Sequence, residues 1–300
     1  MSAGAGAVEA RFKGAFLVVA SAVLFASAGV FTKLIPSDAW TILFWRGLIA
    51  AVFLGALMAM RGSLRDQILR MGWSGFAAAC VSSLGSVAFI PAFKETTVAN
   101  VTLIYTSAPF LAAFVAWIWM REKPSRRCMA AAGAALVGVA VIFGAPAPGV
   151  SVTGDLFALW MTLCMSVAMV IYRRYPATPA VGPMVLSSLM LLPVAVLFSD
   201  PFEVPLGEVP MLTAFGLCFA LASVALLSGA KLLPSSETAL LSIMETPLAP
   251  LLAWLLLAET PSLRCLAGGV LIIAALIWYL GRRPDRGTGR VAAGADNHTV

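Results

Sequence analysis

Long apolar runs recur along the whole chain and limit what it can fold into. Each run holds roughly 17–23 residues, enough for one helix to cross about 30 Å of hydrocarbon. The runs are continuous and do not alternate with polar residues, so they predict helices and not barrel strands. The chain is 61% hydrophobic and only 11% charged. Because a soluble fold could not bury so much apolar surface, the sequence predicts an all-α integral membrane protein in a lipid bilayer.

Ten runs are predicted to be transmembrane helices. They cover residues 14–34, 40–60, 72–93, 97–120, 128–143, 154–172, 181–198, 209–232, 236–258 and 265–280. No gap between them is long enough to hold a soluble domain. Residues 1–12 are expected to form an N-terminal tail and residues 282–300 a disordered C-terminal tail.

The basic residues predict the orientation of these ten spans. With an even number of spans, both termini and the even-numbered connections lie on one side of the membrane. That side holds sixteen of the 20 Lys and Arg residues, the other side holds Lys33, Lys94 and Arg264, and Arg46 lies inside the second span. The positive-inside rule places the basic side, and both termini, in the cytoplasm. We therefore expect a multi-pass protein of a bacterial inner membrane, and the positive net charge needs no nucleic-acid partner.

A repeated passage divides the chain into two halves. The sequence REKPSRRC starts at Arg121, and AETPSLRC starts at Ala258, 137 residues later. The predicted first repeat covers residues 13–143, a connecting loop covers 144–152, and the second repeat covers 153–281. Each repeat holds five spans, an odd number, so the second repeat must enter the membrane from the opposite side. This inversion explains why the second copy, which is predicted to be external, has lost most of its positive charges.

Inverted repeats favour a transport function. Two similar halves related by an axis in the membrane plane can exchange conformations and open a central site to one side and then to the other. The alternative is that the duplication only built a stable bundle.

The repeated passages also resemble a known family. TSAPFLAAFVAWIWMREKPSRRC, from Thr106, and METPLAPLLAWLLLAETPSLRC, from Met244, resemble the repeated signature of EamA-type transporters of the drug/metabolite transporter superfamily. Arg46, in LFWRG, occupies a place where such proteins often carry an arginine. Within the superfamily the chain is most similar to YddG-like aromatic amino acid exporters. The resemblance implies ten helices and a cavity bounded by helices one, three, four, six, eight and nine.

Glu245 is the main candidate for substrate binding. It lies near the middle of the ninth predicted span, where an ionisable residue is costly and suggests a function. Ser242 shares its helical face, and Pro247 can free backbone carbonyls nearby. The alternative is that Glu245 pairs with helix N–H groups or with Arg46 and only holds the bundle together.

Other polar and aromatic residues of the implied cavity helices complete the candidate set. The further substrate-binding candidates are Ser83, Ser86, Asn100, Tyr105 and Trp160. Serine and threonine in membranes more often serve helix packing, and the two aromatic residues could equally belong to the interfacial belt. Arg46 and Lys94 are expected to have structural or gating roles, and hinges are expected near Pro91, Pro109, Pro234 and Pro247.

An enzyme or a channel fits the sequence less well. The single histidine, His298, lies in the C-terminal tail, and there is no phosphate-binding Gly-Lys loop. Nothing resembles the selectivity filter of an ion channel. We therefore expect a carrier, not an enzyme, without metal or cofactor. It would move amino acids with aromatic or apolar side chains and related small metabolites, as a monomer or weak homo-oligomer. Nucleotide sugars or drugs remain the alternative cargo, and proton coupling stays open.

Overall fold

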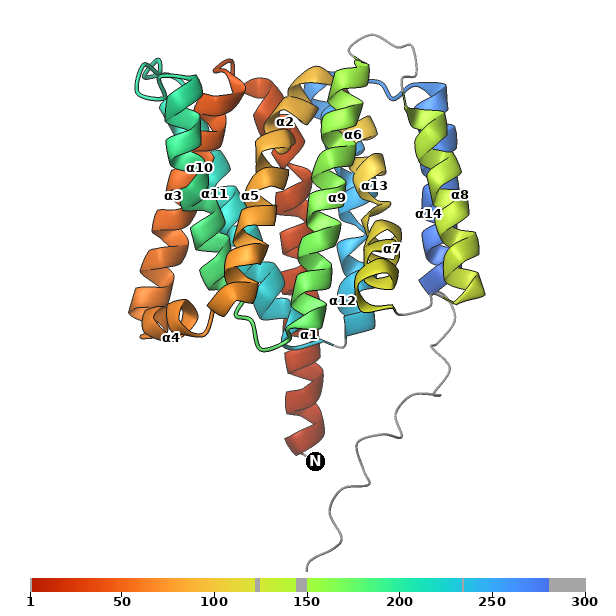
Figure 1. The fold of residues 1–300 in the computed structure, drawn as a ribbon, viewed down its shortest axis with the longest axis horizontal. Helices are drawn as coiled ribbons and strands as arrows, with labels where there is room; N and C mark the ends of the chain where they lie inside the picture. Colours follow the sequence, from red (N-terminus) through yellow and green to blue (C-terminus); the bar gives the residue numbers. More distant parts are fainter. Residues whose placement is uncertain (1, 122–124, 144–149, 234, 281–300) are drawn as a thin grey trace, which may run out of the picture.

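All regular secondary structure in the described part of the chain is helical. The computed structural model describes residues 2–121, 125–143, 150–233 and 235–280, and its helices run between the same two ends of one bundle (Figure 1). The helices are α1 (Ser2–Ala26), α2 (Ala28–Leu34), α3 (Ala39–Met60), α4 (Leu64–Leu69), α5 (Gly72–Glu95), α6 (Val98–Tyr105), α7 (Ala108–Met120), α8 (Arg126–Ile142), α9 (Val152–Arg174), α10 (Val181–Phe198), α11 (Val209–Ala230), α12 (Ser235–Ser242), α13 (Glu245–Leu257) and α14 (Leu263–Leu280). The disorder expected for residues 282–300 lies outside the described residues.

Each predicted span coincides with one helix or with two consecutive helices. Within the described residues, seven helical segments are long and apolar enough to cross a membrane. They are Glu9–Leu34, Ala39–Met60, Gly72–Glu95, Val98–Met120, Val152–Arg174, Val181–Phe198 and Val209–Ala230. The remaining predicted spans fall on α8 with 17 residues, on α12 and α13, and on α14. The chain is thus an all-helical membrane protein, and the count of ten crossings stays a prediction.

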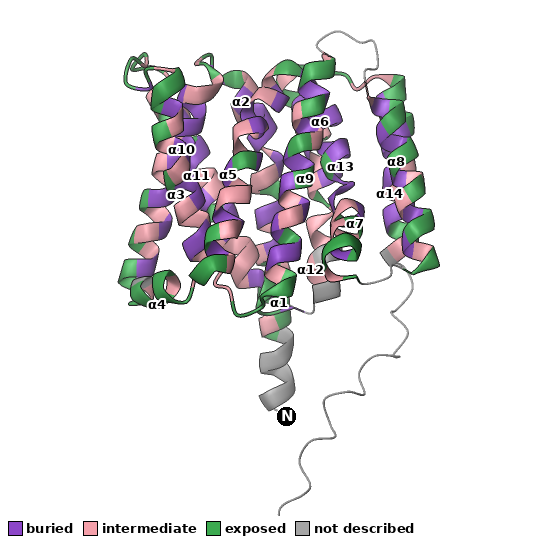
Figure 2. Ribbon diagram, in the orientation of Figure 1, coloured by how far each residue is buried: buried purple, intermediate pink, exposed green. Residues whose placement is uncertain are grey.

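The pattern of burial in the bundle is that of a protein surrounded by lipid. Buried residues occur along the whole height of the bundle, and exposed residues alternate with them on the same helices (Figure 2). Large apolar side chains such as Phe16, Val52, Leu197 and Val270 are more than half exposed. In water such an apolar surface would drive association, whereas lipid chains solvate it at no cost.

The strongest helix pairings join one helix from each predicted repeat. Helix α5 packs on α9, α1 on α11, α3 on α10, and α8 on α14. The two halves are therefore interleaved and share their core. One large cluster of buried apolar residues, including Ile104, Val139, Met161 and Ile272, draws on helices of both halves.

The two ends of the bundle differ in charge. We call the end that holds α4 and the start of α1 the inner end, and the opposite end the outer end (Figure 1). Helix termini at the inner end carry mainly basic residues, among them Arg61, Arg121, Arg126, Arg173 and Arg174. Those at the outer end carry mainly acidic residues, among them Asp38, Glu95, Asp155, Glu208 and Glu259. This separation is what the predicted cytoplasmic location of the inner end requires.

Candidate substrate site at two broken helices

Two helical segments are interrupted at matching positions in the two halves. Helices α6 and α7 are separated by Thr106 and Ser107, and α12 and α13 by Ile243 and Met244. Both ends of α6 and both ends of α7 map onto the ends of α12 and α13 at one offset of 137 residues. The C-caps of α7 and α13, Arg121 and Ala258, keep the same offset, and both adopt a left-handed backbone. The repeat seen in the sequence is therefore a repeat of backbone conformation.

Prolines and hydroxyl groups account for the interruptions. Pro109 is the second residue of α7 and Pro247 the third of α13, positions where a missing N–H is tolerated but the preceding turn loses its hydrogen bonds. The hydroxyl of Thr106 donates to the carbonyl of Thr102 (2.8 Å), and that of Ser107 to the carbonyl of Ile104 (2.7 Å). Both carbonyl oxygens also accept a backbone N–H, from Thr106 and Ser107 at 3.0 Å, so each hydroxyl adds a second hydrogen bond at the break.

The other two predicted hinges differ from these. Pro91 lies inside the continuous helix α5, so no break accompanies it. Pro234 lies outside the described residues. Only Pro109 and Pro247 therefore adjoin an interruption that the structure describes.

The two breaks meet inside the bundle. The side-chain hydroxyls of Thr106 and Thr246 are 3.0 Å apart and share a hydrogen bond, and both residues are buried. The interrupted segments thus contact each other at the place where the two helices are broken. Discontinuous helices that meet in this way form the substrate sites of many transporters.

Three of the predicted binding residues lie at this meeting point. Tyr105 ends α6, Ser242 ends α12, and Glu245 begins α13. Tyr105 is within electrostatic range of Glu245, and its side chain keeps 36% of its accessible surface although it belongs to an interior helix. Glu245 is half-buried and forms no hydrogen bond or ion pair with any residue that the structure describes. Its position in the first turn of α13 lets the helix dipole stabilise a carboxylate.

Arg46 lies elsewhere in the bundle, on α3. It is buried, with 3% of its surface exposed, and its guanidinium faces the rings of Phe89, Phe215 and Phe219. The pairing of Arg46 with Glu245, which the sequence left open, is not among the ion pairs of the described residues.

The remaining predicted residues serve contacts between helices. Ser83 donates to the carbonyl of Ser187 on α10 (2.8 Å), whereas Ser86 is half-buried on α5. Trp160 donates its indole N–H to the carbonyl of Leu84 (3.3 Å), and both residues are exposed at the contact of α5 with α9. These positions favour packing for Ser83 and Trp160, and their predicted role in binding stays untested.

Asn100 belongs to a buried polar cluster that the sequence analysis missed. Its amide and the hydroxyl of Thr96 donate to one carboxylate oxygen of Asp155, at 3.1 and 2.9 Å, and all three residues are fully buried. Asp155 lies in the first turn of α9, where the helix dipole favours a negative charge. The sequence could have indicated Asp155, because it lies just inside a predicted span, where an ionisable residue is rare.

Charged groups also close the outer end of the bundle. Lys33 of α2 pairs with Glu259 at 3.3 Å, and Glu259 accepts a hydrogen bond from the backbone N–H of Val98, at the start of α6 (2.6 Å). Lys94 donates to the carbonyls of Ile35 and Ser37, at 3.0 and 2.7 Å, which fastens the end of α5 to the segment after α2. The predicted structural role of Lys94 fits this contact.

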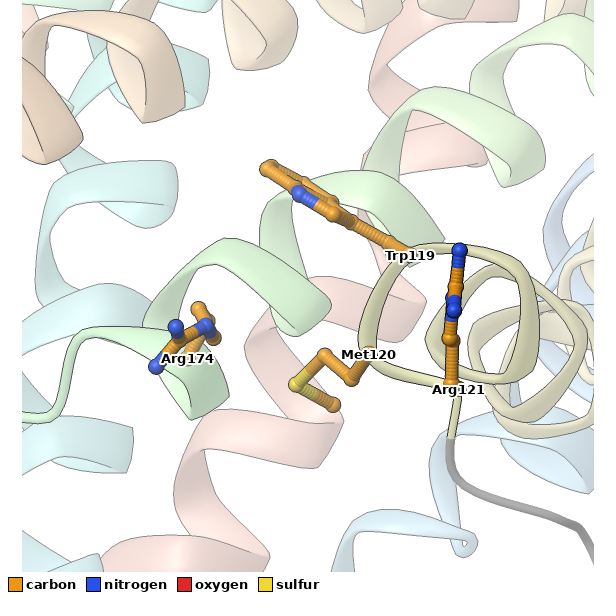
Figure 3. A pocket seen from close by; sticks show the side chains of 4 residues that line it. All are labelled: Trp119, Met120, Arg121 and Arg174. Atoms are coloured by element: carbon orange, nitrogen blue, oxygen red, sulfur yellow. The ribbon is translucent and has the colours of Figure 1, made fainter.

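The inner end carries a hollow on its surface. A hollow of about 370 Å³ lies there between α7 and α9, lined by Trp119, Met120, Arg121 and Arg174 (Figure 3). Two of its four residues are basic, so it would attract anions. Among the residues that the structure describes, no group of three or more His, Cys, Asp or Glu side chains could hold a metal ion.

An all-helical bundle of apolar helices with two broken helices in contact is an architecture that many membrane transporters share. The model of the EamA-like transporter family matches the chain twice, over residues 12–144 and 152–281. The chain belongs to the EamA-like transporter family, and the resemblance to EamA-type proteins seen in its motifs is confirmed. It is therefore a multi-pass membrane protein of the drug/metabolite transporter type that carries small molecules.

Comparison with solved structures supports the fold. One crystal structure, 19% identical in sequence, aligns with a TM-score of 0.58 and covers 88% of this chain and 95% of its own. Comparison with curated proteins finds no match. The family thus fixes the class of transporter and leaves the cargo open.

Proposed function

We propose that the protein is a carrier that exports amino acids, or facilitates their passage, by alternating access. Its preferred cargo would have an aromatic or apolar side chain, with related small metabolites as further substrates. The carrier would work in a bacterial inner membrane with both termini in the cytoplasm, as a monomer or weak homo-oligomer. Its two inverted repeats, residues 13–143 and 153–281, would exchange conformations during transport.

The hydrogen bond between Thr106 and Thr246 is the observation that supports this proposal most directly. It joins the interruption of one repeat to the interruption of the other. A substrate at this place would contact both repeats, so a movement of one against the other would change the side from which the substrate is reached. Tyr105 and Glu245 adjoin the same place, and the aromatic ring of Tyr105 suits an apolar or aromatic side chain of the cargo.

Contacts between helices at both ends of the bundle fit one state of such a cycle. The ion pair of Lys33 with Glu259 and the bonds of Lys94 hold the outer end together. At the inner end, the ion pair of Arg11 with Glu237 (2.7 Å) and the hydrogen bond between the hydroxyls of Ser74 and Thr178 (2.6 Å) also join helices. We infer that the structure corresponds to a state in which both ends are held closed.

Glu245 is our candidate for coupling transport to protons. A carboxylate without a hydrogen-bond or ion-pair partner among the described residues can take up a proton when the site opens to one side. If it does so once per cycle, a pH gradient would drive export. If it does not, the protein would be a facilitator whose direction follows the concentration of its cargo.

A different cargo on the same fold is the main alternative. Nucleotide sugars carry phosphates and would need several cations around the site, and the basic hollow at the inner end is the observation that favours such a multiply charged anion. The basic side chains that line it, Arg121 and Arg174, are exposed at the bundle's end. They are more simply explained by the positive-inside rule.

Transport into liposomes tests the proposal. We would measure uptake of labelled aromatic and aliphatic amino acids by the wild type and by Glu245→Gln, with and without a pH gradient. Saturable uptake that responds to the gradient in the wild type but not in Glu245→Gln would support a proton-coupled carrier. Saturable uptake that is indifferent to both changes would leave a facilitator.

Glu237→Gln is the matched control. Its carboxylate lies on α12, eight residues before Glu245, and bonds to the exposed Arg11 at 2.7 Å. It should keep the pH response of the wild type. Absence of uptake for every amino acid, by protein that is folded and inserted, would reject amino acids as the cargo.

A further inference from the structure

Arg46 is the most deeply buried cation among the described residues. It is the eighth residue of α3, about 10 Å along the helix axis from the outer end, and 3% of its surface is exposed. A guanidinium has five N–H donors and stays charged in a protein interior. Burial removes the water that would otherwise accept these hydrogen bonds, so the charge needs acceptors from elsewhere.

The other cations that are not exposed each donate to at least one oxygen atom, although Nε of Arg127 has no partner among the described residues. Lys33 pairs with the carboxylate of Glu259, Lys94 donates to two backbone carbonyls, and Arg127 donates to the carbonyl of Trp278. Arg46 has no hydrogen bond or ion pair with any residue in the described part of the chain. The difference is not explained by exposure, because Arg46 is the most enclosed of the four.

Aromatic rings surround Arg46 instead of oxygen atoms. The guanidinium carbon lies 4.8 Å from the ring centroids of both Phe89 and Phe219, and 5.8 Å from that of Phe215. Cation–π contacts stabilise the charge through the faces of the rings, but they do not satisfy N–H donors at the edge of the guanidinium. The edge is the part that binds a carboxylate through two parallel hydrogen bonds.

The same rings extend toward the helices of the implied cavity. Phe219 contacts Phe25 of α1 with centroids 5.9 Å apart, and Phe215 stacks on Phe31 of α2 at 5.4 Å. Phe25, Phe31 and Phe219 are only half-buried, so their faces are partly open. A cation and an accessible aromatic surface therefore lie next to each other.

We propose that Arg46 anchors the carboxylate of the cargo and that Phe25, Phe31, Phe89 and Phe219 contact its apolar body. This inference rests on the proposed carrier function and names the part of the cargo that this site holds. One desolvated guanidinium matches a single negative charge, so the site selects a monocarboxylate over a phosphate or a nucleotide sugar. The faces of the rings stabilise the charge of the guanidinium until the carboxylate arrives.

Binding to the purified full chain tests this without requiring transport. We would measure the shift in unfolding temperature caused by phenylalanine, by 3-phenylpropionate, which lacks the amine, and by phenethylamine, which lacks the carboxylate. We expect the two carboxylates to stabilise the wild type and phenethylamine to bind at least about 10-fold more weakly, because it cannot form the charge-assisted pair. Equal stabilisation by phenethylamine and 3-phenylpropionate, or none by either carboxylate, would overturn the proposal.

Variants then assign the preference to Arg46. Arg46→Gln should lose the discrimination between 3-phenylpropionate and phenethylamine, whereas Arg127→Gln, the matched control, should keep it. If Arg46→Gln does not fold, Phe219→Leu provides the test, because it keeps the cation. Phenylalanine and 3-phenylpropionate should then bind more weakly than to the wild type, but still more tightly than phenethylamine. Retention of the full preference in folded Arg46→Gln, or its loss in folded Phe219→Leu, would reject the assignment.

The outcome is separable from that of the proposed function. If the carboxylates bind through Arg46 but no amino acid is taken up by liposomes, the anion site stands and the amino acid carrier fails. If amino acids are transported but phenethylamine binds as well as 3-phenylpropionate, the carrier stands and the role of Arg46 fails.

Discussion

Thr106 and Thr246 share a hydrogen bond of 3.0 Å although 140 residues separate them in the chain. Each belongs to a segment where a helix is interrupted, and the two segments come from opposite halves. The hydroxyl of Thr106 also donates to the carbonyl of Thr102, so its proton is already used and Thr246 is the donor across the interface. The two interruptions are therefore coupled through one identifiable bond.

Thr246→Val should remove that bond while keeping the shape of the side chain. We expect a loss of about 0.6 kcal/mol in the free energy of unfolding, the average for hydrogen bonds between membrane helices. Because one bond joins the two hydroxyls, Thr106→Val combined with Thr246→Val should cost less than the sum of the single changes. Unfolding titrations of the wild type, the two single variants and the double variant in mixed micelles measure these free energies. Thr213→Val is the control, since its hydroxyl bonds only within α11, and strictly additive losses for Thr106 and Thr246 would contradict the coupling.

Lys33→Gln should loosen the outer end. The ion pair with Glu259 is partly exposed, so its loss corresponds to about 0.5–1 kcal/mol, or a two- to fivefold shift toward an outward-open state. Two native cysteines report on this shift, because Cys265 at the outer end and Cys128 at the inner end hold equivalent positions, each with its N–H bonded to a serine hydroxyl at 3.1 Å.

Maleimide labelling followed by mass spectrometry measures both cysteines in one sample. Cys265 is fully buried and follows Glu259 by six residues, so its labelling rate in Lys33→Gln should rise two- to fivefold while that of Cys128 does not. The wild type treated in the same way supplies the reference. A parallel rise for both cysteines would indicate general loosening, and an unchanged Cys265 would contradict a closing role for the ion pair.

Gly138→Ala should destabilise the contact of α8 with α14. A Cβ atom at Gly138 would lie 2.6 Å from Cγ1 of Ile272 and 2.8 Å from the carbonyl oxygen of Gly268. Such overpacking costs about 1–3 kcal/mol, since backbone cannot move aside. Gly133 lies on the same helix with nothing within 4 Å of its added Cβ, so Gly133→Ala should be neutral or stabilising. Thermal unfolding in detergent compares the two, and equal changes in unfolding temperature for both variants would contradict a specific cost of close approach at Gly138.

Asp38→Ala should weaken the start of α3. One carboxylate oxygen accepts from the backbone N–H groups of Trp40 and Thr41, and the other from the hydroxyls of Thr41 and Ser199. Loss of such an N-cap costs about 0.5–2 kcal/mol. Asp66→Ala, on the exposed helix α4, is the control and should cost less.

The contribution of Asp38 should depend on pH. Partial burial acts to raise its pKa, but the hydrogen bonds from Thr41, Ser199 and Trp40 outweigh burial and hold the pKa below the ordinary 3.8. A lowered pKa in the folded state means that the stabilisation is complete above the unfolded pKa and is lost as pH falls through the folded one. The difference in unfolding temperature between wild type and Asp38→Ala should therefore be constant from pH 7 to about 5 and shrink below 3.8. A difference that persists unchanged at pH 2.5 would contradict a charged cap.

Parts of the site were predictable from local pattern. Glu245 stood out because it is an ionisable residue in an apolar run, and Pro109 and Pro247 because proline removes a helical hydrogen bond. Each of these arguments uses only neighbours along the chain. Asp155, by contrast, gains its meaning from Thr96 and Asn100, which lie 59 and 55 residues away, and no local pattern pairs them.

The sequence by itself determined that this protein lies in lipid, where its helices begin and end, and the offset between its repeats. These features depend on residues close together in the chain, because an apolar run needs only one membrane span and a helix break only about one turn. Only the tertiary structure decided which side chains meet. It joined Thr106 to Thr246 and Lys33 to Glu259, and it placed Arg46 among phenylalanines from α5 and α11 and away from Glu245. In lipid, apolar faces pack almost equally well in many registers, so the few polar and aromatic contacts that select one register depend on the whole bundle.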